Sequence, residues 1–200
     1  MEFKLEGGAL TLEKELSDLD KLVIEFASLL DQCKIRYVIV SGYLAILFGR
    51  TRGTEDVDLF VERMDHAKFS RFLGVLDKRG YWILNAENGE EGFDMLNDKL
   101  AIRVAKKGDA VPNLKMKYQK NDLDHSSLEH PLKVSVSGNN LLVSQLEIQI
   151  PFKLWLGSDK DIEDAVHIYE LFKEKLNKTL MARAAEKLNV KKEMEKYGIL

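Results

Sequence analysis

The stretch that decides the fold runs from Tyr37 to Val61 and reads YVIVSGYLAILFGRTRGTEDVDLFV. It begins with an apolar, β-branched run over residues 37–40, which is typical of a buried strand. Ser41-Gly42 ends that strand, and residues 43–48 follow as a short predicted helix. After a polar turn, residues 57–61 form a second predicted strand.

Two acidic residues, Asp56 and Asp58, stand at the start of the second strand, two positions apart. Because side chains alternate between the faces of a strand, both carboxylates point the same way. Neighbouring carboxylates repel each other unless a cation lies between them, and Mg²⁺ bound through carboxylate and phosphate oxygens meets that need. Ser41 and Gly42 offer backbone N–H groups to an anion where a helix opens. The pattern indicates a nucleotide-handling site, although an isolated Asp-x-Asp also fits ordinary turn chemistry.

This combination resembles the signature of the polymerase-β-type nucleotidyltransferase superfamily: a strand, a glycine-containing turn, a short helix, and Asp-x-Asp on the next strand. Residues 52–58, RGTEDVD, are similar to the Arg-x-Thr-x-Asp-x-Asp form of its bacterial and archaeal branch, which includes toxins of abortive-infection and toxin–antitoxin systems. The resemblance implies metal-dependent transfer of an NMP from an NTP to an acceptor, which is RNA or tRNA, a protein or a small molecule.

The resemblance also implies roles for particular residues. Asp56 and Asp58 are expected to be catalytic and to hold Mg²⁺ or Mn²⁺. The expected nucleotide-binding residues are Ser41, Gly42, Tyr43, Arg52 and Thr54.

The chain departs from the family pattern on the predicted strand at residues 100–105. Many members place a third carboxylate there, after an arginine and an apolar residue, and it helps to deprotonate the attacking hydroxyl. Here Arg103 and Val104 are followed by Ala105. The alternative to an enzyme is therefore a degenerate member that binds a nucleotide or a partner without turnover. One half of a toxin–antitoxin pair is a further reading.

A second group of polar residues lies near the C-terminus: Lys153, Asp161 and Asp164. It resembles a Lys…Asp-x-x-Asp region of the toxin-like branch, and this resemblance implies that Lys153 neutralises triphosphate charge and that Asp161 acts as a base or orients one. The alternative is structural, because Ser158 followed by Asp161 also approximates a capping box at a helix start.

The most basic part of the chain spans residues 106–133 and includes Lys115, Lys117 and Lys120. Lysines commonly guard an exposed sheet edge, and this is the favoured interpretation. The alternative is a contact surface for a triphosphate or an RNA backbone.

Composition limits the class of protein. The 200 residues are 45% hydrophobic and 32% charged, which suits one domain with an appendage or two small domains. A formal charge of −3 argues against general nucleic-acid binding. Cys33 is the single cysteine, and the sequence has neither a signal-peptide pattern nor an apolar run of about 18 residues. We therefore expect a cytoplasmic protein without membrane contact, and we leave a homo-oligomer open.

The predicted fold is α+β, with a mixed sheet flanked by helices over residues 1–143 and a helical C-terminal domain over residues 144–200. A cleft between the two would hold the nucleotide. The individual predictions are a loose leader (1–10), helices (11–33, 65–79, 144–156, 159–174, and one or two within 179–197), a strand (81–84) and a hairpin (132–143).

Overall fold

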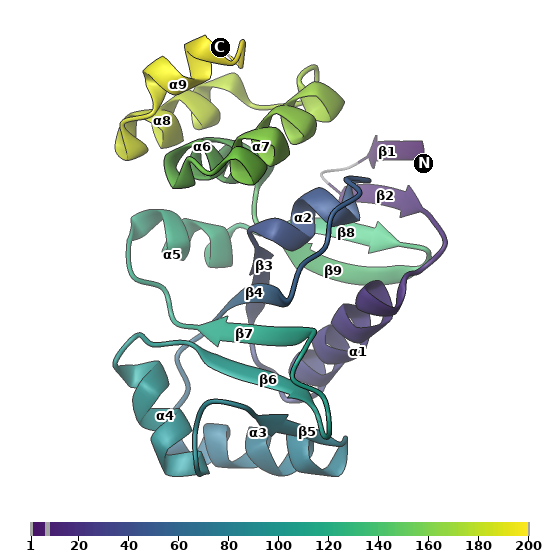
Figure 1. Cartoon of the computed structure of the whole chain (residues 1–200), viewed down its shortest axis with the longest axis vertical. Coiled ribbons are helices and arrows are strands. Elements are labelled where there is room, and N and C mark those ends of the chain that lie inside the picture. Colours follow the sequence, from purple (N-terminus) through teal and green to yellow (C-terminus); the bar gives the residue numbers. More distant parts are fainter. Residues whose placement is uncertain (1, 7–8, 200) are drawn as a thin grey trace.

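The computed structural model describes residues 2–6 and 9–199. Their strands form one mixed sheet of nine strands, in the order β1-β2-β8-β9-β3-β4-β7-β6-β5, and helices flank it, which confirms the predicted α+β class (Figure 1). The strands are β1 (Glu2–Glu6), β2 (Ala9–Glu13), β3 (Tyr37–Val40), β4 (Asp56–Val61), β5 (Tyr81–Ile83), β6 (Ile102–Lys106), β7 (Asn113–Lys117), β8 (Leu132–Val136) and β9 (Asn139–Val143). The helices are α1 (Asp18–Gln32), α2 (Gly42–Leu47), α3 (His66–Lys78), α4 (Gly89–Asn97), α5 (Asp122–Glu129), α6 (Leu146–Leu156), α7 (Asp159–Phe172), α8 (Lys178–Leu188) and α9 (Lys191–Lys196).

The centre of the sheet consists of β3, β4 and β7. β3 and β4 run antiparallel, with Ile39 opposite Leu59 and Val40 opposite Asp58. β7 runs parallel to β4, places Lys115 beside Asp58, and pairs with β6 on its other side. β7 is therefore an internal strand, and the prediction that its lysines guard a sheet edge is wrong.

The two faces of β4 have different surroundings. Leu59 belongs to the large core, which includes apolar residues of α1 and α3. Phe60 lies on the opposite face and joins a small second core with Leu128 of α5. Because side chains alternate along a strand, Asp56 and Asp58 share the face of Phe60.

The N-terminal segment differs from the prediction of a loose leader over residues 1–10 and a helix over residues 11–33. β1 and β2 form an antiparallel hairpin, β2 joins β8 in the sheet, and α1 begins only after β2 has ended. The physical reason is a period of two in β2, where Leu10 and Leu12 are buried and the residues after each of them are exposed. Residues 1, 7 and 8 lie outside the described part of the chain.

Several other elements lie where the sequence predicts them. The helices expected at residues 65–79 and 159–174 are α3 and α7, and the expected hairpin at residues 132–143 is β8 with β9. The C-terminal helical region consists of α8 and α9.

The described chain contains no strand after β9, and α6 packs against α7, α8 and α9 at one end of the molecule (Figure 1). α6 continues through Pro151. Ser144, which follows β9, donates a hydrogen bond from its hydroxyl to Ser127 Oγ of α5 (2.9 Å). The predicted domain boundary coincides with the end of β9, and a separate C-terminal domain stays a prediction. Among the described residues, no helix is both long enough and apolar enough to cross a membrane.

Candidate functional site

The acidic pair at the start of β4 is accessible from one side of the sheet. The Asp56 and Asp58 side chains are 32% and 15% exposed. Thr54 supports the turn before the strand, because its hydroxyl donates a hydrogen bond to the backbone carbonyl of Asp56 (2.7 Å). The two carboxylates therefore share one face, as the spacing predicts.

Two lysines of β7 face this pair. Lys117 Nζ lies 3.0 Å from Asp58 Oδ1. Lys115 Nζ lies 3.8 Å from Asp56 Oδ2 and 4.0 Å from Asp58 Oδ1. The formal charges of the four groups cancel, so this surface presents an equal number of cations and anions to a ligand.

The strand that pairs with β4 beside the acidic pair is β7, which carries these lysines, and not the strand on which a third carboxylate was expected. The family resemblance put the third carboxylate at residue 105, where the chain has alanine, but that residue lies on β6, which is paired with β5 and β7 and not with β4. Ala105 is fully buried. The position that faces Asp58 on the neighbouring strand is Lys115. Within residues 2–6 and 9–199, no group of three or more His, Cys, Asp or Glu side chains is arranged to hold a metal ion.

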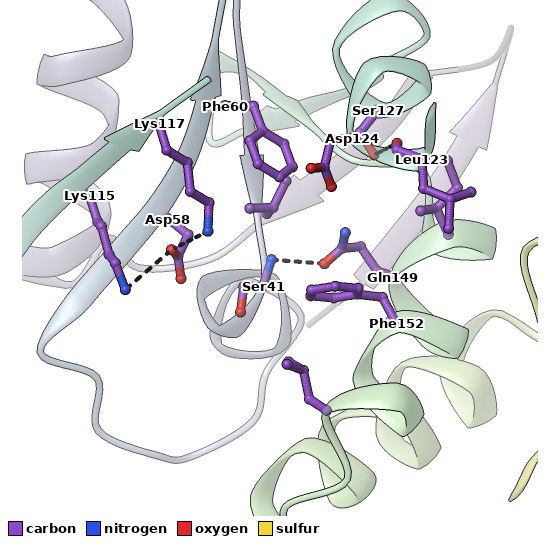
Figure 2. A pocket seen from close by; sticks show the side chains of 13 residues that line it. Ser41, Asp58, Phe60, Lys115, Lys117, Leu123, Asp124, Ser127, Gln149 and Phe152 are labelled. Carbon is purple, nitrogen blue, oxygen red and sulfur yellow. Dashed lines mark hydrogen bonds and ion pairs between the residues drawn. The ribbon is translucent and has the colours of Figure 1, made fainter. Parts of the chain in front are cut away.

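A cavity of about 270 Å³ opens in front of Asp58 (Figure 2). One wall belongs to the sheet and carries Asp58 and both lysines. The other wall belongs to α5 and α6 and is mostly apolar, with Phe152 facing the sheet. The lining residues are Val40, Ser41, Asp58, Phe60, Lys115, Lys117, Leu123, Asp124, Ser127, Ile148, Gln149, Phe152 and Leu156.

The turn between β3 and α2 makes contacts within the chain. Ser41 has a positive φ of 67°, and its backbone N–H donates a hydrogen bond to Gln149 Oε1 of α6 (2.8 Å). A Cβ at Gly42 would lie 2.1 Å from Arg52 Nη2. The absence of a side chain at Gly42 thus leaves room for the Arg52 guanidinium, in the space that the sequence argument assigned to a phosphate.

Tyr43 was predicted to bind the nucleotide, but its side chain does not line the cavity. Its side chain is fully buried, and its hydroxyl donates a hydrogen bond to Asp20 Oδ1 of α1 (2.9 Å). Burial raises the pKa of the Tyr43 hydroxyl, and the charge of Asp20 raises it further. The side chain therefore joins α2 to α1, and only the backbone of Tyr43 is left for contact with a ligand.

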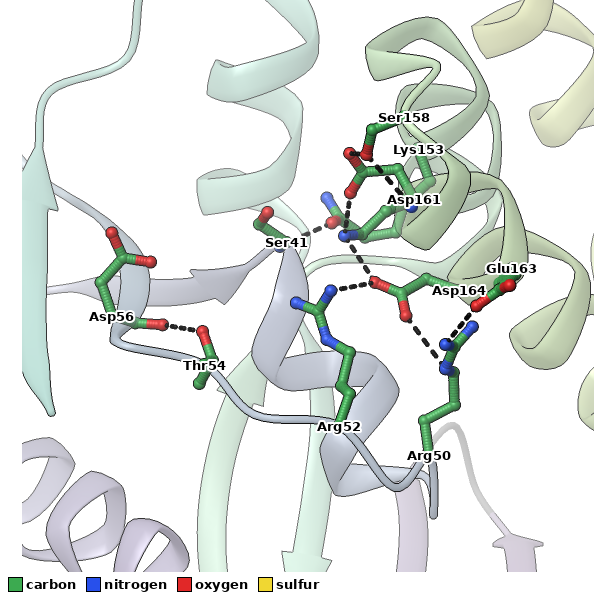
Figure 3. A network of polar contacts seen from close by, with 11 residues as sticks. Ser41, Arg50, Arg52, Thr54, Asp56, Lys153, Ser158, Asp161, Glu163 and Asp164 are labelled. Atoms are coloured by element: carbon green, nitrogen blue, oxygen red, sulfur yellow. Dashed lines mark hydrogen bonds and ion pairs between the residues drawn. The ribbon is translucent and has the colours of Figure 1, made fainter.

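A buried ionic network lies on the other side of the Ser41 turn (Figure 3). Lys153 of α6 is 1% exposed and its Nζ contacts Asp161 Oδ1 (2.7 Å) and Asp164 Oδ2 (2.8 Å) of α7. Asp164 also pairs with Arg50 Nε and Arg52 Nη1, each at 3.3 Å. The network thus connects the C-terminal helices to the loop that precedes β4.

The contacts of Asp161 show the structural interpretation, and its catalytic role stays a prediction. Its backbone N–H donates to Ser158 Oγ, so the predicted helix cap is present, and its carboxylate also pairs with Lys153. Burial opposes its charge, but hydrogen bonds from Lys153 and Ser158 outweigh burial and hold the pKa of Asp161 below its usual range. Neither Lys153 nor Asp161 lines the cavity at Asp58.

Sequence reasoning missed several cavity residues. The sequence predicts a sheet-edge guard, or a contact surface for a triphosphate or RNA, at Lys115 and Lys117, but does not place them beside Asp56 and Asp58. The alternation in NLKMK puts both lysines on one face of a strand. Asp124, Gln149 and Phe152 come from α5 and α6. No sequence signal connects these helical residues to β4, because only the packing of the helices brings them there.

Comparisons with known proteins place this architecture. A nucleotidyltransferase-like antigenic protein from Paracoccidioides brasiliensis has 19% sequence identity and a TM-score of 0.56, over 90% of this chain and 91% of that chain. The antibiotic-resistance factor ANT(2'')-Ia has 11% identity and a TM-score of 0.52, over 91% and 98% of the respective chains. The chain has a nucleotidyltransferase-like fold. No protein-family model and no curated protein matches the sequence.

At these identities the comparison shows the fold and not the reaction. The expected superfamily resemblance is thus supported at the level of fold. The toxin-like branch stays a prediction.

Proposed function

We propose that this nucleotidyltransferase-like chain transfers an NMP from an NTP to an acceptor hydroxyl. The observation that carries the proposal is that Asp58 opens into a cavity beside the Ser41 turn, with Asp56 on the same strand face and lysines opposite. Carboxylates bind the metal ion of a metal–triphosphate, and lysines bind its phosphate groups directly. This combination serves phosphoryl transfer better than any reaction that needs a nucleophilic side chain.

The donor set at β4 fits a magnesium ion. Mg²⁺ is commonly held by one or two carboxylates together with substrate phosphates, and Asp56 and Asp58 supply two carboxylates on one face. When bound, the ion would supply positive charge that offsets the negative charge developing during transfer. Lys115 and Lys117 would then release the carboxylates and neutralise phosphate oxygens instead.

The loop before β4 supports this site through its contacts. Arg52 approaches Gly42 at the start of α2 and pairs with Asp164, while Thr54 fixes the backbone at Asp56. Lys153 and Asp161, predicted to be catalytic, would act from a distance, because their network holds the arginines of this loop in place. The Ser41 turn would contact the triphosphate only if the Gln149 amide yields its hydrogen bond to the incoming phosphate.

The acceptor we favour is a small molecule. The cavity of about 270 Å³ lies between the sheet and the α5–α6 wall, so there is little room beside a nucleotide for a folded macromolecule. One of the similar structures is an antibiotic-resistance factor. RNA, tRNA and protein acceptors are tested in the same experiment.

A second function is favoured by one observation, the 3.0 Å contact between Lys117 and Asp58. If this pair persists when nucleotide binds, the lysine takes the place of the metal ion. The protein would then bind a nucleotide or a partner without turnover, as expected of a degenerate member or of one half of a toxin–antitoxin pair.

The deciding experiment is label transfer. The chain is incubated with each α-labelled NTP, Mg²⁺ or Mn²⁺, and total tRNA, casein, glycerol or glucosamine. The expected result is label on one acceptor with the native chain and none with Asp58→Asn, whereas the control Glu55→Gln, which removes an exposed neighbouring charge, keeps the activity. Nucleotide binding without transfer to any acceptor would favour the second function.

A further inference from the structure

The proposed transfer needs a group that takes the proton of the attacking hydroxyl, and the strand paired with β4 on this side, β7, carries lysines beside the acidic pair. A lysine paired with a carboxylate is protonated and is a poor proton acceptor. Lys117 contacts Asp58 at 3.0 Å and Lys115 lies within 4.0 Å of both aspartates. β7 therefore does not supply this group.

The buried ionic network does not supply it either. Asp161 and Asp164 both accept hydrogen bonds from Lys153, and Asp164 is fully buried between that lysine and two arginines. Neither aspartate lines the cavity. A proton acceptor must lie within hydrogen-bond reach of the reacting hydroxyl, and these carboxylates do not border the space that a substrate could fill.

One other carboxylate lines the cavity, and it belongs to Asp124 of α5. Figure 2 shows it on the helical side, directed into the space between Phe60 and Gln149. Its Oδ2 accepts the backbone N–H of Lys120 (2.9 Å). No hydrogen bond to its Oδ1 is found within the described residues. The N–H bond fixes the carboxylate and leaves one oxygen for a ligand.

The charged side chains that share this space are on the sheet wall. They are Asp58, Lys115 and Lys117, whereas α6 lines the cavity, in its described part, with apolar side chains and the amide of Gln149. Asp124 thus stands apart from the acidic pair, on the opposite wall. This is the arrangement needed for an acceptor that lies between a base and an activated phosphate.

We propose that Asp124 is the catalytic residue that binds the acceptor hydroxyl and takes its proton, a proposal that rests on the nucleotidyl transfer inferred above. The acceptor O–H bond breaks and its proton passes to Asp124 Oδ1. The acceptor oxygen forms a bond to the α-phosphorus of the NTP. The bond from that phosphorus to the bridging oxygen of the β-phosphate breaks, and pyrophosphate leaves with the electron pair. The substrate class is a small alcohol, because the cavity that Asp124 lines has a volume of only about 270 Å³.

The test compares Asp124→Asn with the native chain, using the label-transfer reaction and the acceptor found there. The asparagine amide oxygen can still accept the Lys120 N–H, so the variant is expected to keep the native melting temperature. We expect its kcat to fall by roughly 100-fold or more, as on loss of a general base. The nucleotide Kd, measured by calorimetry with Mg²⁺ and a non-hydrolysable NTP analogue, stays within about twofold of the native value.

A matched control is available on the same helical turn. Asp122 carries the same charge, but its side chain is 89% exposed and does not line the cavity. Asp122→Asn should therefore keep both transfer and binding. In the native chain, kcat should rise with pH on the acidic side of its pH profile, because the base loses its proton there. This rise should be absent from Asp124→Asn and return in part in Asp124→Glu.

The outcomes separate this proposal from the one on which it rests. If the native chain transfers label and Asp124→Asn retains a third of the rate or more, the role of Asp124 is refuted and nucleotidyl transfer stands. If the Asp124→Asn nucleotide Kd weakens as much as its rate falls, Asp124 binds nucleotide and is not the base. If the native chain transfers no label to any of the four acceptors, both proposals fail together.

Discussion

Replacement of Lys117 by methionine tests whether the β7 lysines compete with a metal ion for the acidic pair. Lys117 Nζ is 3.0 Å from Asp58 Oδ1, and the two side chains are 27% and 15% exposed. Methionine has a similar length without the charge. The variant therefore leaves Asp58 with the more distant Lys115, at 4.0 Å.

The size of the effect follows from these distances. Two unit charges about 4 Å apart interact by about 4 kcal/mol at an effective dielectric constant of about 20. Partial exposure of both side chains screens a large share of this. We expect a net gain of about 1.4 kcal/mol in metal binding, which is about a tenfold lower Kd. Without metal, the Lys117→Met variant should be less stable by about 1 kcal/mol, because Asp58 has lost a close partner.

The assay is calorimetric titration of the apo protein with Mn²⁺ and, separately, with an NTP in the presence of EDTA. Lys117→Met should bind Mn²⁺ more tightly, because the lysine no longer competes for Asp58. It should bind the metal-free nucleotide more weakly, because the lysine no longer neutralises phosphate charge. Lys120→Met is the control, since this exposed lysine lies three residues further along the chain and does not line the cavity. Unchanged or weaker Mn²⁺ binding by Lys117→Met would refute the competition.

Three further predictions concern the polar groups behind the cavity. Lys153→Met removes the buried cation shared by two aspartates and should lower the free energy of unfolding, measured in urea, by about 3 kcal/mol. The control Lys160→Met, at an exposed lysine, should change the free energy of unfolding little. Equal effects of the two substitutions would contradict a stabilising role of the network. Hydrogen bonds from Lys153 and Ser158 overcome burial and lower the pKa of Asp161, so its stabilising contribution is complete above about pH 4 and is lost as the pH falls through the lower folded pKa. Urea melts of Asp161→Asn at each pH should therefore show a shallower loss of stability below about pH 4, and a slope like that of the native chain would refute this. Tyr43→Phe leaves Asp20 without one hydrogen-bond donor and should lower the free energy of unfolding, measured by thermal unfolding, by about 1 to 2 kcal/mol. The nucleotide Kd should stay unchanged, and weaker nucleotide binding would instead support the predicted contact between Tyr43 and the ligand.

The acidic pair and its shared face could be predicted from the sequence because both depend on local alternation and turn residues. Asp56 and Asp58 needed only a period of two. The N-terminal hairpin was missed for a related reason. Leu10 and Leu12 alternate as in a strand, but the leucines that follow continue at helical spacing and hide the change of period.

The features that no local pattern specifies depend on long-range packing. Which strand lies beside β4 is decided by the parallel pairing with β7, so Ala105 was taken for the facing position that Lys115 occupies. The space beside Gly42 was assigned to a phosphate because a glycine in the sequence indicates that another group lies close to the backbone. The sequence does not indicate that this group is the Arg52 guanidinium. Asp124 reaches the cavity through the packing of α5, which leaves no trace in the spacing of residues.

The central claim is that Asp56 and Asp58 bind a metal–triphosphate at the cavity that Asp58 lines. It is tested most directly by a crystal structure with Mn²⁺ and a non-hydrolysable NTP analogue, in which manganese is located by its anomalous scattering. The account predicts a manganese peak about 2.1 Å from an oxygen of each carboxylate, with the triphosphate in contact with the same ion and Lys117 turned to the phosphates. A nucleotide bound elsewhere, or one bound here with Lys117 still on Asp58 and no anomalous peak, would contradict it.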